Sequence, residues 1–318
     1  PGLSLLITRH LGHSWENDLE ELERIRGMAE DAGFRREFRE IKLANKRRLD
    51  AEVQRRVGID LDVHSLFDVQ VKRIHEYKRQ LLNLLYVVTR YHKLRANPDA
   101  FAVPRTVIFA GKAAPGYVMA KGIIKLINNV ASIVNADESI QGKLKVVFLP
   151  DYDVSLAQRI MPAADLSEQI STAGLEAAGT GNMKLSLNGA LTIGTLDGAN
   201  IEIREQVGAE NIFIFGLQAH EVTSLKARGY APETFVASNP DLARTLDMID
   251  SGYFSPANVF DGKPIVGRLL SDGEPFLVLA DFAAYAKAQD AVDALYLQPD
   301  EWSRKAVLNA LGMGTFSS

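Results

Sequence analysis

Basic side chains crowd one short segment of the chain, where an apolar strand-like run gives way to a helix-like run. The segment reads Val71-Lys72-Arg73-Ile74-His75-Glu76-Tyr77-Lys78-Arg79, with four permanent cations at the strand end and in the first helical turn. Cations at a helix N-terminus are unfavourable by up to about 1 kcal/mol each, because that end is already positive. A bound anion makes cations at this position favourable, because they then attract it. The segment therefore predicts an anion site, with neutralisation by Glu76 and nearby acids as the alternative.

A glycine-rich segment carries the second candidate site, Glu176-Ala177-Ala178-Gly179-Thr180-Gly181-Asn182-Met183-Lys184. Glycine permits close backbone approach, Thr180 or Asn182 can cap the helix that follows, and the helix start offers N–H groups to a phosphate. The spacing differs from the Walker and dinucleotide-binding loops, so an ordinary cap is the alternative. Lys184, one turn into the helix, can form a Schiff base with an aldehyde cofactor such as pyridoxal 5′-phosphate. A lysine that merely extends into solvent is the alternative.

Strand-like and helix-like runs alternate around these two segments. Strands are expected at 66–71, 107–109, 144–149, 191–196 and 212–215, with helices at 76–95, 117–134, 155–161, 181–189 and over much of 219–310. This alternation predicts an α/β fold, a Rossmann-like parallel sheet with helices on both faces. Ligands of such sheets bind beyond the carboxyl ends of the strands, which is where both segments fall.

Residues 1–58 are predicted to form a helical N-terminal segment, followed by the α/β domain at 59–318. Apolar residues of this first part recur at steps of three and four. Nine basic residues lie between 35 and 56, and without base-stacking aromatics they indicate a solvated helix face and no nucleic-acid partner.

Composition excludes several classes of protein. The 318 residues are 47% hydrophobic and 24% charged with a formal net charge of −4, which argues against disorder and against a strongly basic binder. The absence of cysteine excludes disulfide scaffolds, thiolate metal sites and cysteine nucleophiles. No apolar run approaches the roughly 20 residues of a membrane helix, so no membrane partner is expected. His10 and His13 stand without an acid–histidine cluster, so no metal site is predicted.

Several longer stretches resemble the glycogen (α-glucan) phosphorylase family. The likeness covers most of residues 60–216 and continues more loosely toward both ends. The stretches that carry it are Ser65–Asn83, Gly111–Tyr117, Ile160–Gly174, Gly179-Thr180-Gly181-Asn182-Met183-Lys184 and Asn188–Asn200.

The resemblance implies a pyridoxal-phosphate enzyme of GT-B architecture that converts α-1,4-glucan and inorganic phosphate to α-glucose 1-phosphate. Lys184 would hold the cofactor as a Schiff base. The cofactor phosphate would lie on the Thr180 and Gly181 backbone near Lys72, and Tyr152 would line the pocket. Arg73 and Lys78 would bind the substrate phosphate with Tyr77 beside it, while Glu176 and the Ala177–Gly179 backbone would bind glucosyl hydroxyls. The working group would be the cofactor phosphate, with a second pKa of about 6.

The resemblance also implies a longer, cytoplasmic and allosterically controlled protein, a homodimer whose missing N-terminal domain forms the other wall of the cleft. This chain is therefore expected to be a C-terminal domain fragment, inactive by itself. Ala178 stands where the family often has Ser, which removes one hydroxyl near the sugar. Two alternatives stay open, a GT-B glycosyltransferase using a nucleotide sugar and a non-catalytic fragment that binds phosphate or cofactor. Only the phosphorylase reading requires a lysine that traps the cofactor under borohydride.

Overall fold

Six parallel strands form the centre of the computed structural model, which describes residues 2–271 and 273–316. They are β1 (Leu66–Val71), β2 (Arg105–Ala110), β3 (Leu144–Leu149), β4 (Leu166–Gln169), β5 (Leu191–Gly194) and β6 (Phe213–Ile214). Their order in the sheet is β3-β2-β1-β4-β5-β6, and every neighbouring pair is parallel. The chain moves outward from β1 to β3 and then crosses back to place β4 beside β1. The predicted Rossmann-like α/β class is confirmed, and the strand order reverses direction between β1 and β4.

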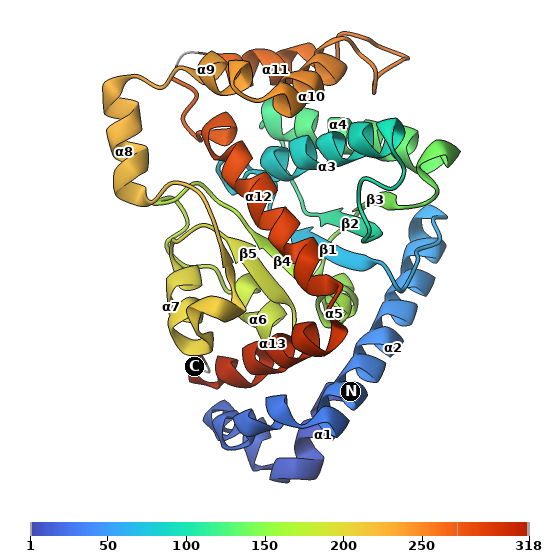
Figure 1. Ribbon diagram of the computed structural model, residues 1–318, viewed down its shortest axis with the longest axis vertical. Helices are drawn as coiled ribbons and strands as arrows, with labels where there is room; N and C mark the ends of the chain where they lie inside the picture. The colour runs from blue at the N-terminus through green and yellow to red at the C-terminus, as the bar shows by residue number, and fades with distance from the viewer. Residues whose placement is uncertain (1, 272, 317–318) are drawn as a thin grey trace.

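Helices cover both faces of this sheet (Figure 1). The α-helices are α1 (Gly2–Leu11), α2 (Ala32–Val57), α3 (Gln80–Ala96), α4 (Val118–Ala136), α5 (Val154–Ala163), α6 (Gly181–Leu187), α7 (Ala199–Val207), α8 (Ala219–Arg228), α9 (Pro232–Ala237), α10 (Pro240–Asp250), α11 (Lys263–Leu270), α12 (Val278–Tyr296) and α13 (Pro299–Gly312). Short 3₁₀ helices include η2 (Leu19–Glu30) and η3 (Glu76–Lys78). No helix in the described residues is both long and apolar enough to cross a membrane.

Alternate residues of the central strands face opposite layers of helices. Val107 and Phe109 of β2 belong to a hydrophobic cluster with α3 and α4, whereas Ile108 and Ala110 belong to a second cluster with α2 and α5. This is the period-two alternation expected of a strand that is buried on both sides. The sheet is therefore fixed from both faces, and its strand ends are free to carry a site.

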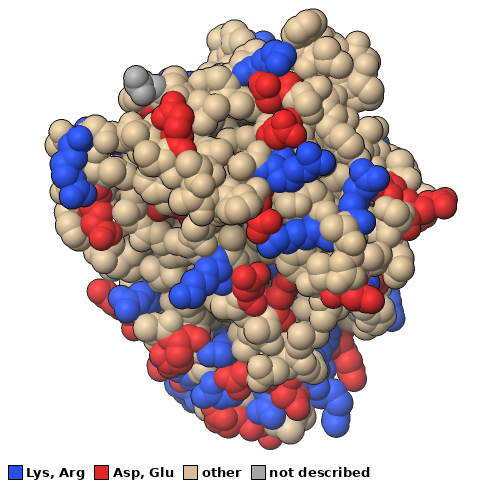
Figure 2. Space-filling model, turned by 45° about the horizontal axis from the view of Figure 1, so that its top comes forward, with Lys and Arg blue, Asp and Glu red and all other residues tan. Residues whose placement is uncertain are grey.

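The basic stretch of α2 is held mostly by pairing and burial. Arg39 pairs with Asp300 at 2.7 Å, and Lys46 pairs with Asp165 at 2.5 Å inside the protein. Lys42 donates to the carbonyl oxygens of Ala164 at 2.7 Å and Asn188 at 2.8 Å. The prediction of a solvated face is thus wrong for the lysines, which anchor α2 to the sheet domain. Figure 2 shows Lys and Arg interspersed with Asp and Glu over the visible face, most densely near the N-terminal helices.

Two elements differ from the sequence prediction. Strand β4 was not expected, because its Leu-Ser-Glu-Gln sequence lacks an apolar run although the first three residues are buried. The helix expected over 76–95 is interrupted, since Arg79 has φ +56° and separates η3 from α3. The basic residues before Arg79 therefore lie in a loop and a 3₁₀ turn, and not in the first turn of an α-helix.

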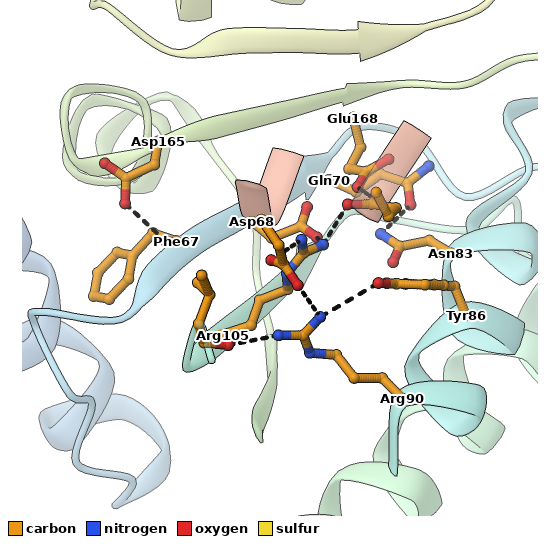
Figure 3. A network of polar contacts seen from close by, with 12 residues as sticks. Phe67, Asp68, Gln70, Asn83, Tyr86, Arg90, Arg105, Asp165 and Glu168 are labelled. Atoms are coloured by element: carbon orange, nitrogen blue, oxygen red, sulfur yellow. Dashed lines mark hydrogen bonds and ion pairs between the residues drawn. The ribbon is translucent and has the colours of Figure 1, made fainter. Parts of the chain in front are cut away.

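A buried polar network joins the central strands to α3 and α12 (Figure 3). Arg105 of β2 contacts Asp68 of β1 at 3.1 Å and Asp293 of α12 at 2.8 Å. Glu168 of β4 accepts hydrogen bonds from Tyr285 at 2.9 Å and Gln289 at 2.8 Å. Asp68, Arg105 and Glu168 are almost completely excluded from solvent.

Burial raises the pKa of the two neighbouring acids in this network, Asp68 and Glu168. Burial, followed by the neighbouring Asp68 carboxyl, raises the pKa of Glu168 well above its usual range. Asp68 Oδ1 is buried and has no hydrogen-bond partner in the described residues, and a protonated Glu168 supplies the missing donor. A proton shared between Asp68 and Glu168 would join β1 to β4 at the place where the strand order reverses.

Replacing Glu168 by glutamine should change how stability depends on pH. If the folded protein keeps a proton on Glu168 that the unfolded chain releases above the ordinary glutamate pKa, the contribution of Glu168 to stability declines as pH rises from 5 to 7. Glu168→Gln is neutral in both states, so its free energy of unfolding relative to wild type should rise by about 1.4 kcal/mol per pH unit. Urea unfolding at pH 5, 6 and 7 measures this, with exposed Glu233→Gln as the control. A difference that does not vary with pH contradicts a protonated Glu168.

Candidate functional site

The two predicted segments meet at the carboxyl ends of β1 and β4. Lys72 directly follows β1, Gln169 is the last residue of β4, and the Lys72 amine lies 2.6 Å from Gln169 Oε1. In doubly wound sheets, ligands bind where the strand order reverses. The expected location of the site at the strand ends therefore coincides with this point of the topology.

Tyr77, Lys78 and Glu176 come together across the two segments. The Lys78 amine lies 2.6 Å from Glu176 Oε2, and the Tyr77 hydroxyl donates to Glu176 Oε1 at 3.4 Å. Ser171 also donates to Glu176 Oε2 at 3.1 Å. Three of the four predicted catalytic side chains therefore contact one another, although Glu176 is about a hundred positions from Tyr77 and Lys78 in the chain.

The backbone around Glu176 is fixed by Asp197 and Gly198. The Glu176 N–H donates to Asp197 Oδ2 at 3.0 Å. Gly198 has φ +49°, and a Cβ at that position would lie 2.0 Å from the Glu176 carbonyl oxygen. Only glycine permits this approach. The same holds at Gly111, where a Cβ would lie 1.9 Å from the Lys72 carbonyl oxygen.

The four cations of the basic turn have different surroundings. Arg73 is exposed, and its guanidinium makes no hydrogen bond or ion pair with the described residues. Lys72 and Lys78 are half-buried at the strand ends. Arg79, which the sequence placed with the other three, is completely buried and pairs with Asp281 at 2.6 Å. The surface therefore carries three of the four predicted cations.

The glycine loop leaves backbone donors open at the start of α6. No acceptor in residues 2–271 and 273–316 is bonded to the N–H of Thr180 or Gly181. A Cβ at Gly181 would meet no atom within 4 Å. Of the two predicted caps, Thr180 makes no side-chain cap bond, whereas Asn182 Oδ1 accepts from the Met183 N–H at 3.0 Å while its amide donates to Asn200 at 3.2 Å. Asn182 packs inward, so the loop backbone faces open space.

The remaining predicted cofactor residues flank one hydrophobic cluster. Val71, which precedes Lys72, and Leu185, which follows Lys184, both belong to the cluster beneath α5, and Tyr152 packs against it. Lys184 is exposed, and its amine has no hydrogen-bond partner in the described part of the chain. Gly179 lies beside Asn182, since a Cβ at position 179 would be 3.4 Å from Asn182 Oδ1. Burial raises the pKa of the Tyr152 hydroxyl.

Positive charge at the site is incompletely compensated. Burial, and then the nearby Lys78 ammonium, lower the pKa of Lys72 to about 8. The Gln169 oxygen is a neutral partner, so it stabilises the Lys72 cation less than a carboxylate would. A bound dianion would supply the missing charge. The arrangement of Lys72 and Lys78 can therefore bind phosphate or sulfate groups.

Gln169, Ser171 and Asp197 were not singled out as site residues, although each contacts one that was. They lie inside the stretches that carry the family resemblance, but their own types indicate no chemistry. A polar residue that ends a strand at a parallel sheet's carboxyl edge is the signal that could have found Gln169.

The sequence matches known carbohydrate phosphorylases along its whole length. A family model described as carbohydrate phosphorylase matches residues 1–318. The glycogen phosphorylase of Chlamydia pneumoniae is 52% identical over 318 residues, which are 100% of this chain and 38% of that relative. The muscle form of glycogen phosphorylase from Oryctolagus cuniculus is 48% identical, again over 100% of this chain and 38% of the relative. The glycogen phosphorylase of Synechocystis sp. is 52% identical over 100% of the chain and 37% of its own length.

Anion affinity at this site should fall as Lys72 loses its proton. Sulfate stays a dianion between pH 7 and 9, so any change in its affinity reports on the protein. We expect sulfate to bind about fivefold more weakly at pH 9 than at pH 7, the equivalent of about 1 kcal/mol for one partly buried charge pair. Titration calorimetry measures this. Lys72→Met should remove most of the pH dependence, whereas exposed Lys287→Met should retain it; equal profiles for all three proteins would exclude Lys72 from the anion site.

Proposed function

Because this chain belongs to the carbohydrate phosphorylase family, we propose that it is the cofactor- and phosphate-binding half of a GT-B glycogen phosphorylase. That enzyme would transfer a glucosyl unit from α-1,4-glucan to inorganic phosphate and release α-glucose 1-phosphate. The observation that carries the proposal is the convergence of Lys72, Tyr77, Lys78 and Glu176 at the point where the strand order reverses. The chain spans about 38% of the length of the first of these relatives, so the whole enzyme's activity is part of the proposal.

Residues 59–318 would form the pyridoxal-phosphate domain, and the groups present fit that cofactor. The donor set combines the Lys72 cation, the open N–H groups of Thr180 and Gly181, and the amine of Lys184. A phosphate ester and an aldehyde need these two kinds of partner. Lys184 would attach the cofactor covalently, with Gly179 giving room and Tyr152 lining the pocket. When bound, the cofactor supplies a phosphate monoester that can exchange a proton near neutral pH.

The basic turn would hold the substrate phosphate. The Arg73 guanidinium has no partner among the described residues, and Lys78 would turn from Glu176 to the phosphate when the phosphate binds. The Tyr77 hydroxyl lies beside both groups and would orient the phosphate. Glu176 would then be released to accept hydrogen bonds from glucosyl hydroxyls, together with the backbone of residues 177–179. Lys78 thus couples phosphate binding to the freeing of the sugar-binding carboxylate.

The partners of the whole enzyme follow from the same proposal. An N-terminal domain of the same protein would form the opposite wall of the cleft, and the complete enzyme would be a cytoplasmic, allosterically controlled homodimer. Catalysis requires groups held to about 0.5 Å on both walls. This chain alone would therefore bind cofactor and phosphate without releasing glucose 1-phosphate. Having Ala178 in place of serine would weaken glucosyl binding little, because the backbone donors of the loop do not depend on the side chain.

Borohydride trapping tests the assignment of Lys184. Reduction of the chain mixed with pyridoxal 5′-phosphate should fix one pyridoxyl group on Lys184, found by peptide mass spectrometry, with absorbance lost in Lys184→Ala. The matched control, exposed Lys121→Ala, should label like wild type. The fold should survive Lys184→Ala, since an exposed lysine contributes little stability. A label on another lysine, or none, would overturn the assignment of Lys184 as the residue that attaches the cofactor.

Replacing Glu176 by glutamine should strengthen the binding of inorganic phosphate. The change removes a negative charge 2.6 Å from the Lys78 amine, and a partly exposed pair of this kind is worth up to about 1 kcal/mol, or about fivefold in affinity. Calorimetry at pH 7 measures it, with exposed Glu202→Gln as the control. Arg73→Ala should weaken phosphate instead. Unchanged affinity in Glu176→Gln would show that Lys78 does not bind the phosphate.

A further inference from the structure

We propose that Arg79 is a positioning residue for the phosphate-binding turn, residues 72–78. Its buried guanidinium holds this turn against residues 170–176, the segment that carries Glu176. This inference rests on the proposed function, because it concerns how that site is assembled. Arg79 lies next to Lys78 in sequence but touches no part of the surface.

The backbone of Arg79 is in an unusual conformation for its residue type. Its φ and ψ are 56° and 39°, in the left-handed region. That region costs a residue with a Cβ roughly 1 kcal/mol, and glycine or asparagine occupies it more readily. The kink separates η3 from α3 and directs Tyr77 and Lys78 toward the strand ends. An arginine at such a position indicates that the contacts of its side chain stabilise the protein by more than the backbone conformation costs.

The guanidinium of Arg79 binds three parts of the chain at once, namely residues 170–171, the Phe276 carbonyl at 3.4 Å and Asp281. Nε donates to the Ile170 carbonyl at 2.7 Å and Nη2 to the Ser171 carbonyl at 3.4 Å. Nη1 donates to Asp281 of α12 at 2.6 Å, inside the protein. Asp281 is itself fixed, because its second oxygen accepts from the Leu217 N–H at 2.9 Å. Only a planar guanidinium presents donors in this arrangement, so a lysine cannot replace it.

The segments joined by Arg79 are those that carry the groups on either side of the phosphate position. Lys78 immediately precedes Arg79, and Ser171 binds Arg79 through its carbonyl and Glu176 through its hydroxyl. The Thr172 N–H also donates to the Tyr77 carbonyl at 3.0 Å. Loss of the guanidinium leaves this backbone bond and the contacts of the Tyr77 and Lys78 side chains with Glu176 to hold the turn against the segment. The Lys78 and Tyr77 side chains would then lose their fixed spacing.

A second buried arginine gives a matched control. Arg90 of α3 is also completely buried and pairs with Asp293 at 2.6 Å. Its Nη2 donates to the Val103 carbonyl at 2.5 Å, so it too joins a carboxylate to a backbone carbonyl. None of the contacts of Arg90 within the described residues reaches the turn. Replacing Arg90 therefore imposes a similar loss of buried bonds far from the phosphate-binding side chains.

The test compares Arg79→Lys with Arg90→Lys in the cofactor-treated chain. Affinity for inorganic phosphate is measured by calorimetry, cofactor attachment by borohydride labelling of Lys184, and stability by thermal unfolding. We expect Arg79→Lys to weaken phosphate binding at least tenfold while the labelling of Lys184 stays close to wild type. Arg90→Lys should lose as much stability as Arg79→Lys, with phosphate affinity within twofold of wild type. Asp281→Asn is the milder variant, since it retains the Leu217 bond, and should weaken phosphate about threefold.

Each outcome separates the two proposals. Phosphate affinity that is unchanged in both Arg79→Lys and Asp281→Asn overturns the positioning role. A parallel fall of phosphate affinity and labelling in the Arg79 and Arg90 variants also overturns it, because that pattern follows stability alone. If Arg79→Lys fails to fold, Asp281→Asn decides. Failure of the wild-type chain to bind phosphate or to label at Lys184 overturns the proposed function itself.

Discussion

An excess of positive charge at the carboxyl ends of β1 and β4 is the constraint on which the rest of the structure depends. Lys72 has a neutral partner in Gln169, Arg73 has none in the described residues, and Glu176 balances Lys78 alone. Glu76, the acid within the same turn, is paired with Arg268 at 2.9 Å. Such a turn is poorly compensated until an anion arrives.

The buried layers explain how this charge is held in place. The network of Asp68, Arg105 and Glu168 fixes β1 against β4 directly beneath the site, and the Arg79–Asp281 pair ties the turn to α12. Removing one partner from such a buried pair is costly, because the other is left as an uncompensated charge. The network and the pair therefore act as the rigid support of a surface whose own charges are only partly satisfied.

The sequence alone predicts the parts of the fold that follow local rules. Strands β1 and β3 coincide with the predicted runs 66–71 and 144–149, because their apolar and β-branched residues are sufficient to define them. Strand β4 could not be found this way, since Ser167 and Glu168 are polar residues whose burial depends on partners in distant segments. Arg79 was misplaced for the same reason: its partner Asp281 is 202 positions away. The crowding of cations at one turn was predictable, because it is a local feature of the sequence.

Phosphorus NMR of the chain loaded with pyridoxal 5′-phosphate tests most directly whether two phosphoryl groups bind side by side. If they do, titration with inorganic phosphate will shift the cofactor phosphorus resonance and raise the pKa of that phosphate, because a second dianion disfavours its ionised form. A saturating phosphate titration that leaves the cofactor resonance and its pH dependence unchanged would contradict the shared site.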